Sequence, residues 1–453
     1  IYRASDAEGA VSNAATVTIT TVPVNDPPLA AADTYETSQD TPLIVPAPGI
    51  LGNDTDVDGP ALFAALETGP ANGTLTLGAE GSFTYAPNAG FAGADSFSYR
   101  ASDSAAASAR ATVTISVAPA PGAESWTPTG SLIVPRTGHT ATLLPNGKVL
   151  VTGGHNASGL LRTAEIYDPP NGVWSVTGNL GSARSGHTAT LLPGGRVLVA
   201  GGLGGWGALK SAEVYDPATG TWASTGALGA RRLGHTATLL GNGRVLVAGG
   251  GSRRAELYNP STGKWSPTGS MNVSRSVHSA TLLPDGAVLA AGGLNGLKVL
   301  RSAEVYEPST GKWRATGSLV AARAAHTATA LLDGTILVSG GVASNGAALA
   351  HAEIYDPAAD RWTAAGRLGT ARSLHASTLL TDGRVLVSGG YGSPLQLLDR
   401  AELFDPATGE WTLTASLAAA RASHTATLLL DGQVLVTGGG ILGLRSSELF
   451  GSP

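Results

Sequence analysis

The sequence predicts an all-β protein in which a seven-bladed β-propeller follows a β-sandwich. The main observation is an internal repeat. Each of seven histidines has an Arg three residues before it, a Gly eight residues after it and a Gly-Gly doublet fourteen and fifteen residues after it. The composition agrees, because 62 glycines and only 13% charged residues suit strands and turns. One repeat cannot bury its own apolar face, so the copies are expected to stack around a closed ring. The seven histidines are His139, His187, His235, His278, His326, His375 and His424.

A second, longer period organises the N-terminal part of the chain. The sequence YRASD at residues 2–6 returns at 99–103, and an ATVTI segment follows each copy. We therefore expect residues 1–24 to be the C-terminal strands of a preceding, truncated repeat. Residues 25–118 are expected to form one complete β-sandwich, with strands at TLTLG, GSFTYAP, DSFSYRAS and ATVTISV. The proline-rich residues 119–125 are expected to form a short linker, and the start at Ile1 indicates part of a longer multidomain chain.

Several motifs in residues 25–118 resemble those of the bacterial cadherin-like, immunoglobulin-like repeats of large surface adhesins. They are NDPP at 25–28, DTPL at 40–43, ILGNDTDVDG at 50–59 and DSFSYRASD at 95–103. The resemblance implies an immunoglobulin-like sandwich and an extracellular or cell-surface location. It also implies that calcium at the junctions between repeats stiffens the rod.

Three aspartates at alternate positions, Asp54, Asp56 and Asp58, form a candidate calcium site. Carboxylates that alternate along a loop can converge on a hard cation, which takes about six to eight oxygen ligands. A plain Asp/Gly turn between strands explains the same pattern, so both interpretations stay open. Asp26, in the NDPP motif, and Asp103 are weaker candidate ligands. No metal or other cofactor is expected in the propeller.

Each propeller repeat divides into four short strands. HTATLL alternates as a strand does, and an Asn-Gly, Asp-Gly or Gly-Gly turn leads to VLVxGG. A loop of variable length precedes a strand of the type AEIYD, and the turn DPATG leads to a strand with a Trp near its start. Over residues 126–450, R-x-x-H, Gly-Gly, A-E-x-Y-D-P and the closing Trp resemble kelch repeats of the bacterial, galactose-oxidase-like kind. The resemblance implies a propeller, a fold that serves both as a binding scaffold and in enzymes.

The ends of the repeat predict how the ring closes. The seventh repeat stops at residues 447–450 without a Trp strand, whereas a Trp strand at 126–130 precedes the first histidine. Pairing of these two segments would complete the last blade and remove an open sheet edge. The propeller is therefore expected to span residues 126–453 and to be closed by the strand of Trp126.

Residues that recur in every repeat are expected to serve the fold rather than a ligand. We interpret the seven histidines as inward-facing residues for packing and hydrogen bonding, not as metal ligands. The recurring Arg and the recurring Glu of AEIYD are charges inside apolar segments, so they are expected to pair within or between blades. The recurring Trp is expected to pack.

Function is expected where the repeat breaks, in the loop between the Gly-Gly doublet and the Ala-Glu pair. This loop has 9, 9, 4, 9, 10 and 10 residues in the first six repeats. Because successive antiparallel strands reverse direction, these loops share one end of the propeller with the TGSL links. Variation at one end is typical of a binding surface. Residues there that depart from the repeat are the candidate ligand contacts: Trp206, His155, Asn156, Lys210, Tyr391 and His351.

Two functions of different classes fit these features. The first is a non-catalytic adhesion or recognition protein that binds a glycan, a surface polymer or another surface protein. The second is a carbohydrate-active enzyme, a polysaccharide lyase or an oxidase. No cysteine is present for a galactose-oxidase-type crosslinked tyrosine, and His155, His351 and Tyr391 lie in three different loops. A structural role in an extracellular filament or sheath is a further alternative.

Charge and hydropathy narrow the choice of partner. The net charge is −5 and no basic run is present, which argues against nucleic acid as the main partner. No apolar run approaches about 18 residues, the length that a transmembrane helix needs, so membrane insertion is not expected.

Overall fold

The computed structural model describes residues 1–453 except 21–23, 60, 104, 119–123 and 452–453. It divides into two compact units: Ile1–Ala89 with Ala94–Ala118, and Gly90–Gly93 with Pro119–Pro453. We call them the sandwich unit and the propeller unit. Apart from two short 3-10 helices, η1 (Gly49–Leu51) and η2 (Pro169–Asn171), the described residues form strands and loops. No helix among them has the length and apolar character needed to cross a membrane. Most of the linker predicted at 119–125 lies outside the described residues.

The sandwich unit contains two sheets, whose strands form where β-branched and aromatic residues alternate with polar ones. One sheet has the order β1-β7-β6-β3, with β1 parallel to β7, and the other has the order β2-β5-β4. The four strands expected between TLTLG and ATVTISV are β4 to β7. The bounds are β1 (Asp33–Ser38), β2 (Leu43–Val45), β3 (Phe63–Thr68), β4 (Gly73–Leu77), β5 (Phe83–Pro87), β6 (Gly93–Ser102) and β7 (Ala111–Ala118).

The sandwich unit buries apolar side chains from both sheets, whereas residues 1–20 stay exposed. Phe83 of one sheet meets Phe97 of the other edge-on, with ring centroids 5.4 Å apart, and both are nearly inaccessible to solvent. Within residues 1–20, Tyr2 and Ala15 form an isolated antiparallel bridge, but none of these residues is buried. The sandwich core therefore lies within residues 25–118.

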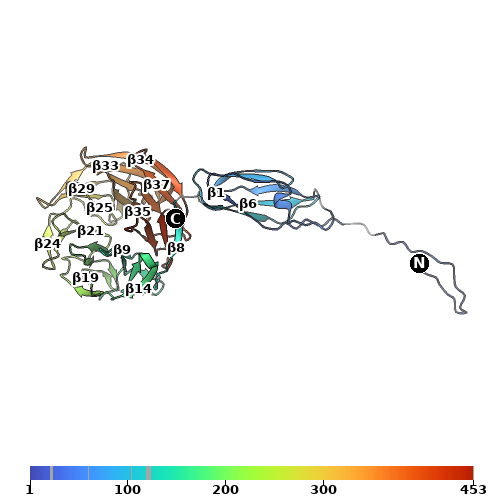
Figure 1. The fold of residues 1–453 in the computed structure, drawn as a ribbon, viewed down its shortest axis with the longest axis horizontal. Helices are drawn as coiled ribbons and strands as arrows, with labels where there is room; N and C mark the ends of the chain where they lie inside the picture. The colour runs from blue at the N-terminus through green and yellow to red at the C-terminus, as the bar shows by residue number, and fades with distance from the viewer. Residues whose placement is uncertain (21–23, 60, 104, 119–123, 452–453) are drawn as a thin grey trace. The chain divides into compact units, whose positions relative to one another are not determined.

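The propeller unit contains seven four-stranded antiparallel sheets in its described residues, arranged around a ring (Figure 1). We call each sheet a blade and number the blades from 1 to 7 in chain order. Blades 1 and 2 comprise β9 (Thr140–Leu143), β10 (Val149–Thr152), β13 (Ala164–Asp168) and β14 (Val173–Thr177), then β15 (Thr188–Leu191), β16 (Val197–Ala200), β19 (Ala212–Asp216) and β20 (Thr221–Ser224). Blades 3 and 4 comprise β21 (His235–Leu239), β22 (Val245–Gly249), β23 (Ala255–Asn259) and β24 (Lys264–Thr268), then β25 (Ser279–Leu282), β26 (Val288–Ala291), β29 (Ala303–Glu307) and β30 (Lys312–Thr316).

The remaining blades repeat the plan. Blade 5 comprises β31 (Thr327–Ala330), β32 (Ile336–Ser339), β33 (Leu349–Asp356) and β34 (Arg361–Arg372). Blade 6 comprises β35 (Ala376–Leu379), β36 (Val385–Ser388), β37 (Ala401–Asp405) and β38 (Glu410–Thr414). Blade 7 comprises β39 (Thr425–Leu428), β40 (Val434–Thr437), β41 (Ser447–Gly451) and, from the start of the unit, β8 (Ser125–Thr129).

The ring closes through β8. The first strands of successive blades contact one another, and β9 contacts both β15 and β39. In blade 7, β41 pairs with β8, which places Phe450 opposite Trp126 with ring centroids 5.0 Å apart. This is the pairing that the sequence predicts. The last blade thereby gains its outer strand, and β41 is left without an unpaired edge.

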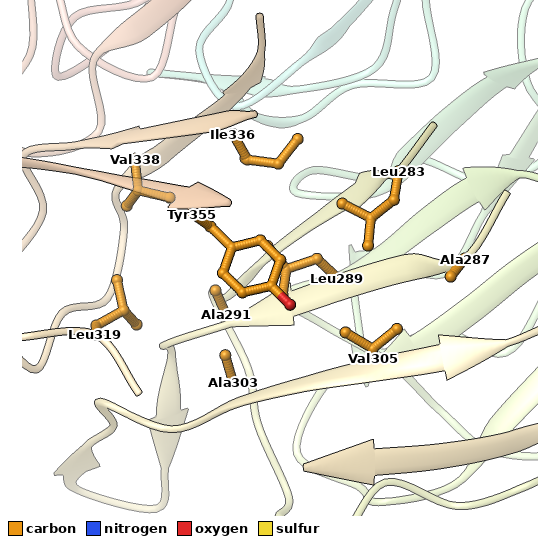
Figure 2. Close-up of a cluster of buried hydrophobic side chains, with 10 residues drawn as sticks. All are labelled: Leu283, Ala287, Leu289, Ala291, Ala303, Val305, Leu319, Ile336, Val338 and Tyr355. Carbon is orange, nitrogen blue, oxygen red and sulfur yellow. The ribbon is translucent and has the colours of Figure 1, made fainter. Parts of the chain in front are cut away.

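The hydrophobic clusters of the propeller lie between neighbouring blades. Figure 2 shows one of them, in which Leu289 and Val305 of blade 4 and Ile336 and Tyr355 of blade 5 point toward one another. All four side chains are at most 1% exposed. Each blade completes its core only against its neighbour, so closure of the ring is needed to bury the first and last blades.

Every blade also contains a buried ion pair. Arg275 is fully buried, and its Nη2 lies 2.7 Å from Oε1 of Glu304. Glu304 also accepts hydrogen bonds from the backbone N–H groups of Asn272 and Val273, which lie in the link between β24 of blade 3 and β25 of blade 4. These bonds offset the cost of taking both charges out of water. The predicted pairing is confirmed within each blade: Arg136–Glu165, Arg184–Glu213, Arg232–Glu256, Arg275–Glu304, Arg323–Glu353, Arg372–Glu402 and Arg421–Glu448.

The recurring histidines form a hydrogen-bonded belt around the ring. In most blades Nε2 bonds to the hydroxyl that follows the histidine of the preceding blade, as for His187 and Thr140 at 2.9 Å. His139 bonds to Thr425 at 3.1 Å, which links blade 1 to blade 7. In six blades the histidine is only 5–8% exposed. Their interpretation as packing and hydrogen-bonding residues is confirmed.

The belt explains why a Gly-Gly doublet follows each second strand. Gly201 and Gly202 have φ values of 61° and 92°, in the left-handed region. A Cβ on Gly201 would lie 2.6 Å from Cε1 of His235 in the next blade. A Cβ on Gly202 would lie 2.8 Å from Cβ of His187 in its own blade. Glycine alone satisfies both the backbone conformation and the two histidines.

Blade 6 tests the importance of the belt, because its histidine is followed by Ala376, which has no hydroxyl. His424 of the next blade bonds instead to Ser388, at 3.1 Å. In blade 5, Ser339 bonds to His375 at 3.2 Å, but His375 also retains Thr327 at 2.8 Å.

We expect Ser388→Ala to lower the free energy of unfolding by about 1–3 kcal/mol, because it leaves the buried ring nitrogen without a partner. The matched change Ser339→Ala should cost less than about 1 kcal/mol, since the other hydroxyl remains. Urea unfolding of the two variants measures the difference. Equal losses would show that the belt contributes nothing specific to stability.

Candidate binding surface

The two ends of the propeller unit carry different kinds of connection. At one end lie the loops between the second and third strands, such as residues 153–163, and the links between blades, such as 178–187. We call it the variable-loop end. At the other end, the hairpin end, lie the turns between first and second strands and between third and fourth strands, such as 144–148 and 169–172.

Small hairpins project from the variable-loop end. They are β11–β12 (His155–Asn156, Gly159–Leu160), β17–β18 (Leu203–Gly204, Gly207–Ala208) and β27–β28 (Leu294–Asn295, Lys298–Val299). Each is tied at its base to the adjacent link by an antiparallel bridge: Thr137 to His155, Ser185 to Leu203, and Ser276 to Leu294. The loops of blades 5 and 6 make the same bridge through Val342 and Tyr391. The variable loops are therefore anchored, and their tips are free to differ.

His155 and Asn156 lie together beside a shallow, mainly apolar hollow of about 310 Å³. His155 Nδ1 lies 3.0 Å from Ser185 Oγ, and Asn156 donates from Nδ2 to the carbonyl of Pro135 at 3.0 Å. Leu203 and Leu233 of the next blades line the same hollow. The structure thus brings two of the predicted contacts together and adds two leucines that the sequence analysis did not single out.

Trp206 stands at the tip of β17–β18 and is 100% exposed. By contrast, Trp222 is half-buried, packs against Tyr215 with the ring centroids 5.0 Å apart and the rings tilted by 45°, and donates from Nε1 to the carbonyl of Gly178. Leu297 occupies the same place at the tip of β27–β28 and is 101% exposed. Alignment of the two loops by their Gly-Gly doublets would have identified Leu297, which the sequence analysis missed. Lys210 is exposed just after the Trp206 hairpin.

His351 and Tyr391 lie apart from the His155 hollow, whose lining includes neither residue. His351 is exposed on β33, in register with Arg367 of β34, and its carbonyl accepts a hydrogen bond from Arg323. Tyr391 is half-buried at the base of the blade 6 loop, where its backbone pairs with Ser373. The six predicted contacts therefore share one end of the propeller unit without forming a single cavity.

The residue before each recurring histidine also lies at the variable-loop end and has a left-handed backbone in every blade. Glycine occupies this position in three blades, but Val277, Ala325, Leu374 and Ser423 occupy it in the others. A non-glycine residue in this region costs about 1–3 kcal/mol. Val277 and Leu374 are 38% and 42% exposed, so their side chains extend the apolar surface beside the histidine belt.

In the sandwich unit, Asp54 is tied to the core rather than free in its loop. Its carboxylate accepts hydrogen bonds from the Ala31 N–H at 2.8 Å and from the Tyr99 hydroxyl at 3.0 Å. Tyr99 also lies 3.4 Å from Asp33. Burial, together with the charge of Asp54, raises the pKa of Asp33 to about 6, and burial raises the pKa of Asp54 as well. The two carboxyl groups thus share a partly desolvated site around one hydroxyl.

The other predicted calcium ligands make turn-like contacts. Asp56 Oδ1 accepts a hydrogen bond from the Asp58 N–H, and Asp58 Oδ2 accepts one from the Asp26 N–H. Asp103 accepts from Ala106 N–H and from Asn25, and these bonds lower its pKa. Asp56 Oδ2 is buried without a partner, beside a hollow of about 630 Å³ that Asp54 and Asp58 also line. Within the described part of the chain, no group of three or more His, Cys, Asp or Glu side chains is placed to hold a metal ion.

Together these features define a β-propeller that displays anchored variable loops at one end, joined in sequence to a β-sandwich. Residues 122–293 and 234–440 match the KLHDC2/KLHL20/DRC7 Kelch-repeats domain, and residues 25–119 match the bacterial cadherin-like domain. The chain therefore belongs to the Kelch-repeat family and carries a cadherin-like domain before the propeller. Both resemblances drawn from the sequence are confirmed.

Solved structures resemble the propeller in fold. One is a fungal alcohol oxidase of the AA5 family in complex with copper, at 19% identity and a TM-score of 0.60, covering 72% of this chain and 76% of that one. Another is YjhT, at 15% identity and a TM-score of 0.51, covering 63% of this chain and 99% of that one. At these identities the similarity concerns the fold alone. No curated protein matches the chain significantly.

Proposed function

We propose that this protein is a non-catalytic recognition protein that binds an extracellular glycan or surface polymer through the variable-loop end of its propeller. The observation that carries the proposal is the placement of Trp206. It is fully exposed at the tip of an anchored hairpin, whereas the Trp that recurs in each blade packs on an aromatic neighbour. A planar aromatic ring held clear of the surface offers a face for stacking on a sugar ring.

Two further features support a binding role. Kelch propellers and cadherin-like domains are interaction modules, and bacterial cadherin-like domains are typically extracellular. The bridges at the base of each loop hold the small hairpins in place, which reduces the ordering cost of binding. The enzyme alternative requires a base and a charge-neutralising group in one cleft, whereas neither His351 nor Tyr391 lines the hollow beside His155.

A glycan array probed with the full chain identifies the ligand, and Trp206→Ala then tests the site. We expect this substitution to weaken binding by about 1–3 kcal/mol, because an exposed aromatic anchor is lost. Its effect on the free energy of unfolding should be small, since Trp206 has no core contacts.

Trp222→Ala is the matched control, because Trp222 packs against Tyr215 and contributes to the blade. It should lower stability and affect binding only through folding. Loss of binding with Trp222→Ala but not with Trp206→Ala would show that the tip of β17–β18 is not part of the binding site. Turnover of a polysaccharide by the purified protein would favour the enzyme alternative.

Calcium binding in the sandwich unit remains a second proposal, and the buried, unpartnered Oδ2 of Asp56 is the feature that favours it. Asp56 and Asp58 would supply carboxylate oxygens, and bound calcium would relieve the repulsion among the neighbouring carboxylates. The present bonds of Asp54 to Ala31 and Tyr99 are those of a structural residue, which favours the plain turn.

A chelator distinguishes the two interpretations of this loop. If calcium binds, EGTA should lower the melting temperature of the full chain, and Asp56→Asn should reproduce most of that shift. A melting temperature that is the same with EGTA and with added calcium would assign the loop to a turn.

A further inference from the structure

The charged side chains of the propeller unit are distributed unequally between its ends. The recurring Glu marks the third strand of each blade. The residue three before it lies at the variable-loop end, and the residue three after it lies at the hairpin end. In five blades the first position is basic: Arg162, Lys210, Arg253, Arg301 and Arg445. In five blades the second position is acidic: Asp168, Asp216, Glu307, Asp356 and Asp405.

The five basic residues occupy one structural position. In each case the backbone carbonyl accepts a hydrogen bond from the N–H of a buried Leu or Met in the adjacent link. The donors are Leu180 to Arg162, Leu228 to Lys210, Met271 to Arg253, Leu319 to Arg301 and Leu132 to Arg445, at 2.8–2.9 Å. One backbone bond therefore holds the backbone of each residue at an equivalent point around the ring. In blade 6 the same bond is made to Asp399, which breaks the pattern of charge.

All five side chains are exposed, and none has a hydrogen-bond or ion-pair partner for its charged group among the described residues. The same end carries five more cations, Arg231, Arg254, Lys298, Arg367 and Arg400. Apart from the seven paired glutamates, Asp399 is the one carboxylate that the described residues place there. At the hairpin end, by contrast, carboxylates outnumber cations: Lys148 pairs with Asp168 and Arg384 with Glu124, whereas Arg196, Arg244, Lys264, Lys312 and Arg361 are exposed among them.

We propose that the variable-loop end binds a polyanion, specifically an acidic polysaccharide, and that the ring of five equivalent cations contacts its carboxylate or sulfate groups. This inference rests on the proposed recognition function and names the chemistry of the ligand. The net charge of −5 conceals the basic end, because residues 1–118 carry 13 carboxylates and only 3 cations, whereas the rest of the chain carries 25 cations and 20 carboxylates. Clustered charge of one sign raises the local concentration of an oppositely charged ligand.

The arrangement favours a polysaccharide over nucleic acid. The equivalent cations are spaced one per blade around a ring rather than packed along one groove, which suits a chain with one charge per sugar or fewer. Trp206 and the amide of Asn156 lie at the same end and offer a stacking face and hydrogen bonds for sugar rings. A nucleic acid carries a charge at every nucleotide and is bound through dense phosphate contacts.

Two variants of equal charge test the proposal. The first combines R162Q, K210Q, R253Q, R301Q and R445Q at the variable-loop end. The second combines R196Q, R244Q, K264Q, K312Q and R361Q, which remove five exposed cations from the hairpin end. Binding of full-length protein to polygalacturonate, dextran sulfate, unsubstituted dextran and duplex DNA is measured by calorimetry at several salt concentrations.

We expect the wild-type protein to bind an acidic polysaccharide with an affinity that falls as salt rises, and the first variant to lose about tenfold or more at low salt. The second variant should stay within about twofold of wild type, because its lost charges lie at the other end. Comparison of the affinities for polygalacturonate and dextran sulfate shows whether the protein prefers carboxylate or sulfate groups.

Three outcomes would overturn the inference: equal losses in both variants, affinity that is independent of salt, or tighter binding to DNA than to either polysaccharide. Salt-independent binding of a neutral glycan that Trp206→Ala abolishes would leave the proposed function standing. Absence of binding to every glycan would contradict both this inference and the proposed function.

Discussion

The free energy of unfolding of the propeller should fall steeply as the pH is lowered from about 7 to about 5. Burial, reinforced by the neighbouring Arg, lowers the pKa of His187 to about 3 and that of His235 to about 4. For His278 it lowers the pKa well below the usual value. Protonation would also leave both ring nitrogens carrying an N–H, and Nδ1 has no partner in any of the seven histidines. The belt is therefore neutral in the folded protein.

The sign follows from which state binds more protons. In the unfolded chain these imidazoles titrate near a pKa of about 6.5, so below that pH the unfolded state takes up protons that the folded state refuses. The stabilisation is complete above pH 6.5 and is lost as the pH falls toward the folded-state values. Each histidine contributes roughly 1 kcal/mol per pH unit in this window, and seven act together.

Urea unfolding at pH 7.5, 6 and 5, followed by tryptophan fluorescence, measures the slope. His235→Gln serves as a control, because it should reduce the slope by the share of one histidine. A free energy of unfolding that is constant across this range would contradict a buried, neutral belt.

Replacing Arg275 by leucine should lower the free energy of unfolding by about 3–5 kcal/mol, because Glu304 is left buried without its counter-charge. The loss also includes the hydrogen bond from Nη1 to the Gly292 carbonyl at 2.8 Å. The two backbone N–H groups that donate hydrogen bonds to Glu304 carry no net charge, so they cannot replace the positive charge of the guanidinium. We expect the loss of structure to be greatest in blade 4, which contains β29.

Lys148→Leu is the matched control, since it removes a cation from an ion pair whose members are 42% and 25% exposed. An exposed pair of this kind contributes about 0–1 kcal/mol. Equal effects of the two substitutions on urea unfolding would refute the role assigned to the buried pairs.

Most of the fold follows from the sequence because each recurring residue has one physical reason to recur. The ion pairs, the histidine belt and the closure by Trp126 were all predictable from the spacing of Arg, His, Glu and Trp, since a charge or a polar ring in an apolar repeat needs a partner. The choice of partner was less predictable. The exchange at Ala376, where Ser388 supplies the missing hydroxyl to His424, depends on the register that places Ser388 opposite Ala376 on the paired strand.

The candidate surface was predictable in location but not in composition. The varying loop lengths predicted which loops differ between blades at one end of the propeller, and the exposure of Trp206 agrees with its place outside the repeat. The sequence could not show that His155 shares a hollow with Leu233 while Tyr391 does not, because loops from different blades are unrelated in sequence. Nor did the net charge of −5 indicate the basic end, since the carboxylates of residues 1–118 outweigh the positive net charge of the rest of the chain.

The most direct test of the proposed function is hydrogen–deuterium exchange of the full chain with and without a saturating polysaccharide identified on the array. Binding at the variable-loop end predicts slower exchange in residues 155–160, 203–208 and 294–299, and unchanged exchange in the hairpins at 145–148, 241–244 and 332–335. Protection confined to those hairpins, or to the sandwich unit, would contradict it.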